Sequence, residues 1–180
     1  MLAKKSNTQE EKNWLKWKFK EYKIKNFDIS ELKIRMDIIP VSLAIAQAAV
    51  ESGWGTSRFA LEGNALYGQW TWSDNGLEPL ENDGGDHKVM QFKILTASIK
   101  AYKKNLNTHS GYIEFREARA NLRNRNEKVT GLKLTQYLDK YAATGKQYIK
   151  KLELTIKKNS LSDFENAKLL STGLRKGIKL

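Results

Sequence analysis

The chain has 180 residues and a formal net charge of +12, from 32 basic and 20 acidic residues. This length suffices for one domain with a hydrophobic core, and an apolar content of 40% excludes overall disorder. The chain has no cysteine, so disulfides and a cysteine nucleophile are excluded. Only two histidines occur, His87 and His109, and neither has a paired ligand pattern, so we expect no metal site and no cofactor.

The basic surface should attract anionic polymers, which include nucleic acid, anionic cell-wall glycans and acidic lipid headgroups. Lysine dominates the excess and is spread along the chain, which favours a solvated surface over a dedicated nucleic-acid site. No run of about 18 consecutive apolar residues occurs, so we expect no transmembrane helix. No apolar segment follows the first five residues, so no secretory signal is visible.

We expect one domain over residues 1–160 with its first twelve residues frayed, then a basic extension over residues 161–180. Aromatic and apolar residues recur at helical spacing from Trp14 onward, which predicts an amphipathic helix to about Lys25. Ser30 is expected to cap a short helix that ends before Pro40.

The run from Val41 to Val50 is apolar at all but two positions, which predicts a helix buried on every side. Gly53 suits a left-handed residue that ends this helix. A second short helix is expected over residues 56–62. Glu51 is therefore expected at the end of a buried helix.

The pattern changes between residues 65 and 95. Residues 66–72 are strand-like, residues 74–76 and 82–86 carry turn signals, and residues 88–94 alternate polar and apolar side chains. These features predict a small antiparallel lobe of two or three strands.

Helical patterns return after the predicted lobe. Thr96 can cap the first of these helices, and three more are expected over residues 112–124, 130–141 and 146–158. The sequence thus predicts an α+β fold that is mostly helical, with a small sheet inserted between helices and a cleft between the lobes.

Glu51 is the first candidate for chemistry. A helix C-terminus and apolar neighbours both disfavour an ionised carboxylate, so both should raise its pKa. A carboxyl that stays protonated can act as the acid of a glycosidase. On position alone, a solvent-facing helix end is an equally good interpretation.

Aromatic residues cluster near Glu51. Trp54 stands between two glycines, which let a ligand approach the backbone closely, and its indole could stack on a sugar ring. Trp70 and Trp72 share one face of the predicted strand. Such a pair forms either a sugar platform or part of a core, and taken alone a core is the better interpretation.

Several ordered motifs together resemble the glucosaminidase domain of glycoside hydrolase family 73, and within it the branch named for the Bax protein of enteric bacteria. The likeness covers roughly residues 30–157 and is carried by Ala46-Gln47-Ala48-Ala49-Val50-Glu51-Ser52-Gly53-Trp54-Gly55, Asn64-Ala65-Leu66-Tyr67-Gly68-Gln69-Trp70, Asn105-Leu106-Asn107-Thr108-His109, Tyr112, Phe115-Arg116, Arg119, Tyr141-Ala142-Ala143-Thr144-Gly145 and Tyr148.

The resemblance implies a lysozyme-like fold and hydrolysis of a β-1,4 bond after N-acetylglucosamine, with peptidoglycan as the usual substrate. It places the family's acid at Glu51 and its recurrent active-site tyrosine at Tyr141. Without the resemblance, Tyr141 would be interpreted as a core residue. Substrate contacts are expected from Gln47, Trp54, Asn64, Tyr67, Gln69, Trp70 and Trp72.

The second carboxylate of the reaction is less well defined. Candidates in the predicted β lobe are Asp74, Glu78, Glu81, Asp83 and Asp86, of which we favour Glu81 and then Glu78 because the family often places a glutamate on this lobe. The substrate's own N-acetyl group offers a route that needs no protein nucleophile.

We therefore expect a monomeric endo-β-N-acetylglucosaminidase that acts on the cell envelope. The alternatives are an inactive glycan-binding module of the same fold and an enzyme for another glycan that contains N-acetylglucosamine. A nucleic-acid binder ranks last, because the aromatic residues cluster near Glu51 and are not interleaved with lysines.

Overall fold

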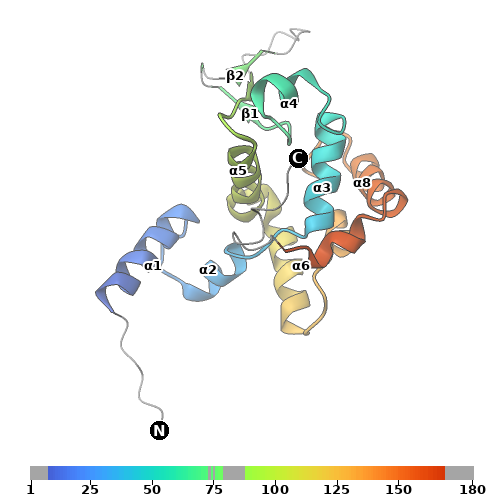
Figure 1. Cartoon of the computed structure of the whole chain (residues 1–180). Coiled ribbons are helices and arrows are strands. Elements are labelled where there is room, and N and C mark those ends of the chain that lie inside the picture. The colour runs from blue at the N-terminus through green and yellow to red at the C-terminus, as the bar shows by residue number, and fades with distance from the viewer. Residues whose placement is uncertain (1–7, 73, 75, 79–87, 169–180) are drawn as a thin grey trace, which may run out of the picture.

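The computed structural model describes residues 8–72, 74, 76–78 and 88–168, and Figure 1 shows its helices and strands. The first half contains α1 (Gln9–Glu21), α2 (Ile29–Arg35), α3 (Val41–Ser52), α4 (Arg58–Gly63), β1 (Trp70–Thr71), β2 (Gly76–Leu77) and β3 (Lys88–Met90). The second half contains α5 (Leu95–Thr108), η1 (Ser110–Tyr112), α6 (Ile113–Asn124), α7 (Gly131–Leu134), η2 (Thr135–Tyr137), α8 (Lys146–Lys158) and η3 (Leu161–Asn166). The predicted α+β architecture, mostly helical with an inserted antiparallel sheet, is confirmed.

The N-terminal helices form a small unit at one side of the molecule (Figure 1). α1 begins at Gln9, so the expected fraying up to residue 12 is wrong for its first turn. A capping box explains the early start, because the Thr8 hydroxyl accepts from the Glu11 amide and the Glu11 carboxylate accepts from the Thr8 amide. Asp28, not Ser30, caps α2, since its carboxylate accepts from the amides at positions 30 and 31.

Helix α3 packs in the main core, but the predicted burial on every side is wrong, because its residues 41, 44, 45 and 48 are half-buried and line an apolar pocket. Leu43 and Ala46 have no exposed surface, and the helix packs against α7, α8 and η3. Its alanines allow these neighbours to approach closely. Gly53 ends the helix in the left-handed conformation, with φ of 57°. The chain therefore leaves the buried helix directly after Glu51 and Ser52.

The last described helix, η3, also packs on α3. Leu161 is buried in the main core, and the Glu165 carboxylate accepts hydrogen bonds from the Ser42 hydroxyl at 2.5 Å and the Gly131 amide at 2.7 Å. The expected boundary after residue 160 falls before this helix, so residues 161–166 belong to the packed domain. Residues 169–180 lie outside the described residues.

The sheet has the strand order β1-β3-β2, and both pairs are antiparallel. Trp70 pairs with Val89, and Gly76 pairs with Met90. The strands are shorter than predicted. Before β1, Gly68 takes a positive φ of 57° and Tyr67 is buried in the main core, so this segment follows a turn instead of a strand.

Two later helices also depart from the expected boundaries. α5 starts at Leu95, and its N-cap is Ile94, so Thr96 lies in the first turn and does not cap the helix. The segment predicted as one helix over residues 130–141 is α-helical only to Leu134 and then becomes the 3-10 helix η2. This change in helix type is followed by the turn that carries Tyr141.

Arg119 connects α6 to the segment that leads into α3. Its side chain is fully buried and donates to the Ile34 and Ile38 carbonyls, each at 2.7 Å, and to Asn107 Oδ1 at 2.8 Å. Burial lowers the pKa of Arg119 to about 10, while the carboxylate of Asp37, 3.6 Å away, favours the charged form. The guanidinium thereby fixes the entry into α3.

We expect Arg119→Met to lower the free energy of unfolding by about 3 kcal/mol, because two carbonyls and an amide oxygen would lose buried donors. Urea unfolding followed by circular dichroism measures this change. Arg125→Met is the matched control, since Arg125 is exposed and pairs with the surface residue Glu127. Equal stabilities of the two variants would contradict the role of Arg119.

Candidate active site

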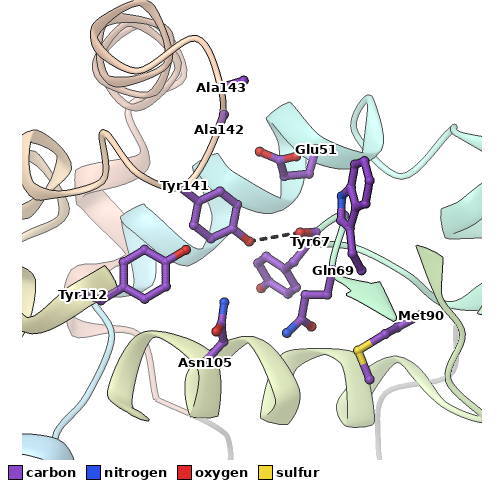
Figure 2. Close-up of a pocket in the computed structure, with 11 residues that line it drawn as sticks. Glu51, Tyr67, Gln69, Met90, Asn105, Tyr112, Tyr141, Ala142 and Ala143 are labelled. Atoms are coloured by element: carbon purple, nitrogen blue, oxygen red, sulfur yellow. Dashed lines mark hydrogen bonds between the residues drawn. The ribbon is translucent and has the colours of Figure 1, made fainter. Parts of the chain in front are cut away.

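A pocket of about 620 Å³ opens beside the C-terminal end of α3, toward the sheet. Figure 2 shows Glu51, Tyr141, Tyr112 and Gln69 arranged around a common space. The pocket combines residues from α3, the segment before β1, β3, α5, η1 and the turn after η2. Its lining consists of Glu51, Tyr67, Gly68, Gln69, Trp70, Met90, Asn105, Tyr112, Tyr141, Ala142 and Ala143.

Glu51 occupies the last turn of α3 and faces this pocket. Burial raises the pKa of its carboxyl above the ordinary value of 4.5, and the hydrogen bond from Tyr148 and the charge of Lys151 lower it by less. The net direction is the one predicted from the sequence. The side chain is thus a carboxyl that holds its proton more tightly than an exposed glutamate does.

Gly68 leaves little room for a side chain beside this carboxyl. A Cβ atom placed on Gly68 would lie 3.1 Å from Glu51 Oε2, and φ of 57° at this residue also favours glycine. Glycine at this position therefore allows the carboxyl to sit against the turn before β1.

Tyr141 reaches the same pocket from a distant part of the chain. Its hydroxyl donates to the Tyr67 carbonyl at 3.0 Å, and its ring stacks on Tyr148 with centroids 5.5 Å apart. Burial raises the pKa of Tyr141 well above its usual range, and the nearby Glu51 adds to the shift. The structure thus brings together Glu51 and Tyr141, the acid and the tyrosine that the resemblance implies.

Three expected substrate contacts also line the pocket. Tyr67 is buried, and its ring stacks on Tyr102 with centroids 3.9 Å apart. Gln69 Oε1 is buried and receives no hydrogen bond from the described residues. The Trp70 side chain is half-exposed at the start of β1. Of these residues, Trp70 offers an aromatic surface to a bound molecule.

The other expected contacts lie elsewhere. Gln47 is 0% exposed and bonded to Tyr102 and Tyr148, so it cannot touch a ligand and the expected direct contact is wrong. The structure places Trp54 on the exposed turn after α3, Trp72 beyond β1 with 78% exposure, and Asn64 at the end of α4, where it donates to the Phe92 carbonyl. None of these three is among the described residues that line the pocket.

The candidates for a second carboxylate are also outside this lining. The Glu78 carboxylate is exposed and lies 3.3 Å from Lys88 Nζ. Asp74 is exposed, and Glu81, Asp83 and Asp86 fall outside the described residues. Among the described lining residues, Glu51 is the one acidic side chain.

Six lining residues were not predicted as site residues, namely Gly68, Met90, Asn105, Tyr112, Ala142 and Ala143. Asn105 hydrogen bonds to Tyr112, whose pKa is raised mainly by burial. Both residues belong to the segments that carry the family resemblance, which was the available signal. They are far from Glu51 along the chain, so no local pattern in the sequence indicates that they line the same pocket.

Within the described ranges, no group of three His, Cys, Asp or Glu side chains is arranged to hold a metal ion. No helix in that part of the chain is long and apolar enough to cross a membrane.

Comparison with known proteins identifies the class. Residues 28–161 match the glucosaminidase family, described as mannosyl-glycoprotein endo-beta-N-acetylglucosaminidase, and the chain belongs to this family. It is 40% identical to Protein bax of Escherichia coli (strain K12) over 115 residues, which are 63% of this chain and 40% of that protein. The chain thus matches less than half of that relative's length.

Among solved structures, the chain is similar to the catalytic domain of the autolysin Auto from Listeria monocytogenes. The identity is 19%, the TM-score is 0.49, and the match covers 90% of this chain and 91% of the other.

We expect Gly68→Ala to destabilise the protein more than Gly55→Ala, by about 1 kcal/mol or more, because only the first introduces a methyl group against Glu51. Both glycines have positive φ, and a Cβ on Gly55 meets nothing within 4 Å. The second variant therefore controls for backbone strain. Thermal unfolding of both variants tests this. Equal decreases in stability would show that a methyl group at position 68 is tolerated beside the Glu51 carboxyl.

Glu51→Gln should make the protein more stable than wild type at neutral pH. A raised pKa means that folding favours the protonated carboxyl, so wild-type stability falls as pH rises above 4.5, the ordinary value. Below that pH both states bind the proton and the difference should vanish. Melting temperatures of the two proteins between pH 3.5 and 8 measure the effect. A difference in melting temperature that increases as the pH falls would contradict the prediction.

Proposed function

We propose that this chain is an endo-β-N-acetylglucosaminidase that hydrolyses the β-1,4 bond after N-acetylglucosamine in peptidoglycan. The proposal depends above all on one observation. A partly buried carboxyl with a raised pKa, Glu51, faces a pocket lined by tyrosines and amides, in a chain of the glucosaminidase family. Such a carboxyl is the acid that glycoside hydrolysis requires.

In the proposed reaction, protonated Glu51 donates its proton to the glycosidic oxygen. The bond between that oxygen and the anomeric carbon breaks, and the departing sugar keeps the proton as a hydroxyl. Positive charge that develops on the ring is then opposite the newly formed Glu51 carboxylate. Tyr141 and Tyr112, whose rings lie 6.1 Å apart on one wall, bound the space for the sugar.

The second half of the reaction adds water to the anomeric carbon, and the Glu51 carboxylate takes the proton that this water releases. With Glu51 as the one acid among the described lining residues, the substrate's N-acetyl oxygen is well placed by its own chemistry to attack first and then yield to water. The rival route uses Glu81 as the base, which is outside the described residues, or Glu78, which here pairs with Lys88. Replacing each glutamate in turn distinguishes the routes.

The features around the pocket suit a long, anionic glycan. The half-exposed Trp70 side chain offers a flat apolar surface to a sugar ring. A net charge of +12 favours association with an acidic wall polymer. We therefore place the activity at the cell envelope.

We expect Glu51→Gln to lower the rate of peptidoglycan digestion by at least about a thousandfold while the fold is kept, because an amide has no proton to donate. Purified peptidoglycan is digested, and mass spectrometry of the fragments reports the new ends, which should be reducing N-acetylglucosamine. Glu62→Gln is the matched control, since Glu62 is exposed on α4 and pairs with Arg58.

Two results would contradict the proposal. Wild-type rates in Glu51→Gln would remove this residue from the mechanism. Binding of peptidoglycan by the native chain without any new reducing ends would indicate a glycan-binding module instead. A mannosyl-glycoprotein substrate, tested in parallel, determines whether another glycan with N-acetylglucosamine is preferred.

A further inference from the structure

A line of buried polar groups leads from the core to Glu51. Tyr102 on α5, Gln47 on α3 and Tyr148 on α8 are 1%, 0% and 4% exposed, respectively. The Tyr102 hydroxyl donates to Gln47 Oε1 at 2.7 Å, and Gln47 Nε2 donates to the Tyr148 hydroxyl oxygen at 3.0 Å. Tyr148 in turn acts on the Glu51 carboxyl as a hydrogen-bond donor that lowers its pKa.

The direction of this line is determined by the chemistry of its members. Tyr102 occupies the amide oxygen of Gln47, so the amide nitrogen is turned toward Tyr148. An amide nitrogen only donates, and the Tyr148 oxygen must therefore act as its acceptor. The one proton of the Tyr148 hydroxyl then goes to its other partner, which is Glu51.

The hydrogen bond from Tyr148 has two effects on the Glu51 carboxyl. It stabilises the carboxylate and so opposes the effect of burial on the pKa. It also distinguishes the two oxygens, because the oxygen that accepts from Tyr148 is the poorer site for the acid proton.

We propose that Gln47 and Tyr102 are positioning residues, which act through Tyr148 to hold one Glu51 oxygen as an acceptor and leave the other to carry the proton into the pocket. The inference rests on the proposed role of Glu51 as the acid. It also gives Gln47 a function that fits its complete burial. Tyr102 is not among the described residues that line the pocket, and its effect reaches Glu51 only through the amide of Gln47.

Carbon-13 labelling of the glutamate carboxyls tests the proposal on the full chain. The Glu51 signal is assigned by its loss in Glu51→Gln, and its pKa is measured by nuclear magnetic resonance titration. Tyr148→Phe removes the donor, so the pKa should rise by about one unit or more. The alkaline limit of activity should rise with it, and kcat should fall at an unchanged KM.

Tyr102→Phe is the decisive second variant. Without the Tyr102 hydroxyl, the Gln47 amide is free to turn its oxygen toward Tyr148, which then donates to Gln47 and releases Glu51. The Glu51 pKa should therefore rise in this variant too. Tyr137→Phe is the matched control, since Tyr137 lies on η2 beside a different pocket, and it should leave the pKa unchanged.

An unshifted Glu51 pKa in folded Tyr148→Phe would overturn the inference. A shift in Tyr148→Phe without one in folded Tyr102→Phe would overturn the positioning role of Tyr102 and Gln47. The titration needs no activity, so its outcome is separate from that of the proposed function. Full activity of Glu51→Gln would remove the catalytic role, even where the pKa shifts follow the proposal.

Discussion

The structure depends on one constraint, namely that a helix buried in the core ends in a carboxyl group. α3 packs against α7, α8 and η3, and its last turn carries Glu51. A carboxylate in such a place loses hydration and opposes the helix dipole. The protein responds by keeping the proton on the group more tightly and by supplying a hydrogen bond from Tyr148. The balance between these effects makes Glu51 a usable acid.

Tyrosines in the walls of the pocket place polar groups near this carboxyl. A tyrosine buries an apolar ring and still offers a hydroxyl at its tip, so it can line a cavity beside a carboxyl without adding charge. Tyr141 holds the Tyr67 carbonyl, and Tyr148 holds Glu51. Stacking of Tyr67 on Tyr102 and of Tyr141 on Tyr148 fixes these hydroxyls in place. The result is a pocket with polar groups in defined positions and an apolar framework behind them.

Much of this site was predictable because its main signal is local. The apolar run before Glu51 indicates a buried helix, and Gly53 indicates where the helix ends. These two features placed the carboxyl correctly at the end of a core helix. Strand lengths were predicted less well, since Leu66 and Tyr67 have strand propensity but are recruited into the core or toward it by contacts with distant helices. Propensity describes a residue alone, whereas packing decides between conformations.

The sequence by itself determined the mostly helical class, the burial of α3 and the position of Glu51, because period, composition and end signals are properties of neighbouring residues. Only the tertiary structure decided that Gln47 turns into the core, that Tyr141 meets Glu51, and that Asn105 lines the same pocket. On the buried face of α3, each polar side chain contacts the element that packs against it. That partner is set by the packing of α5 and α8, which no local pattern contains.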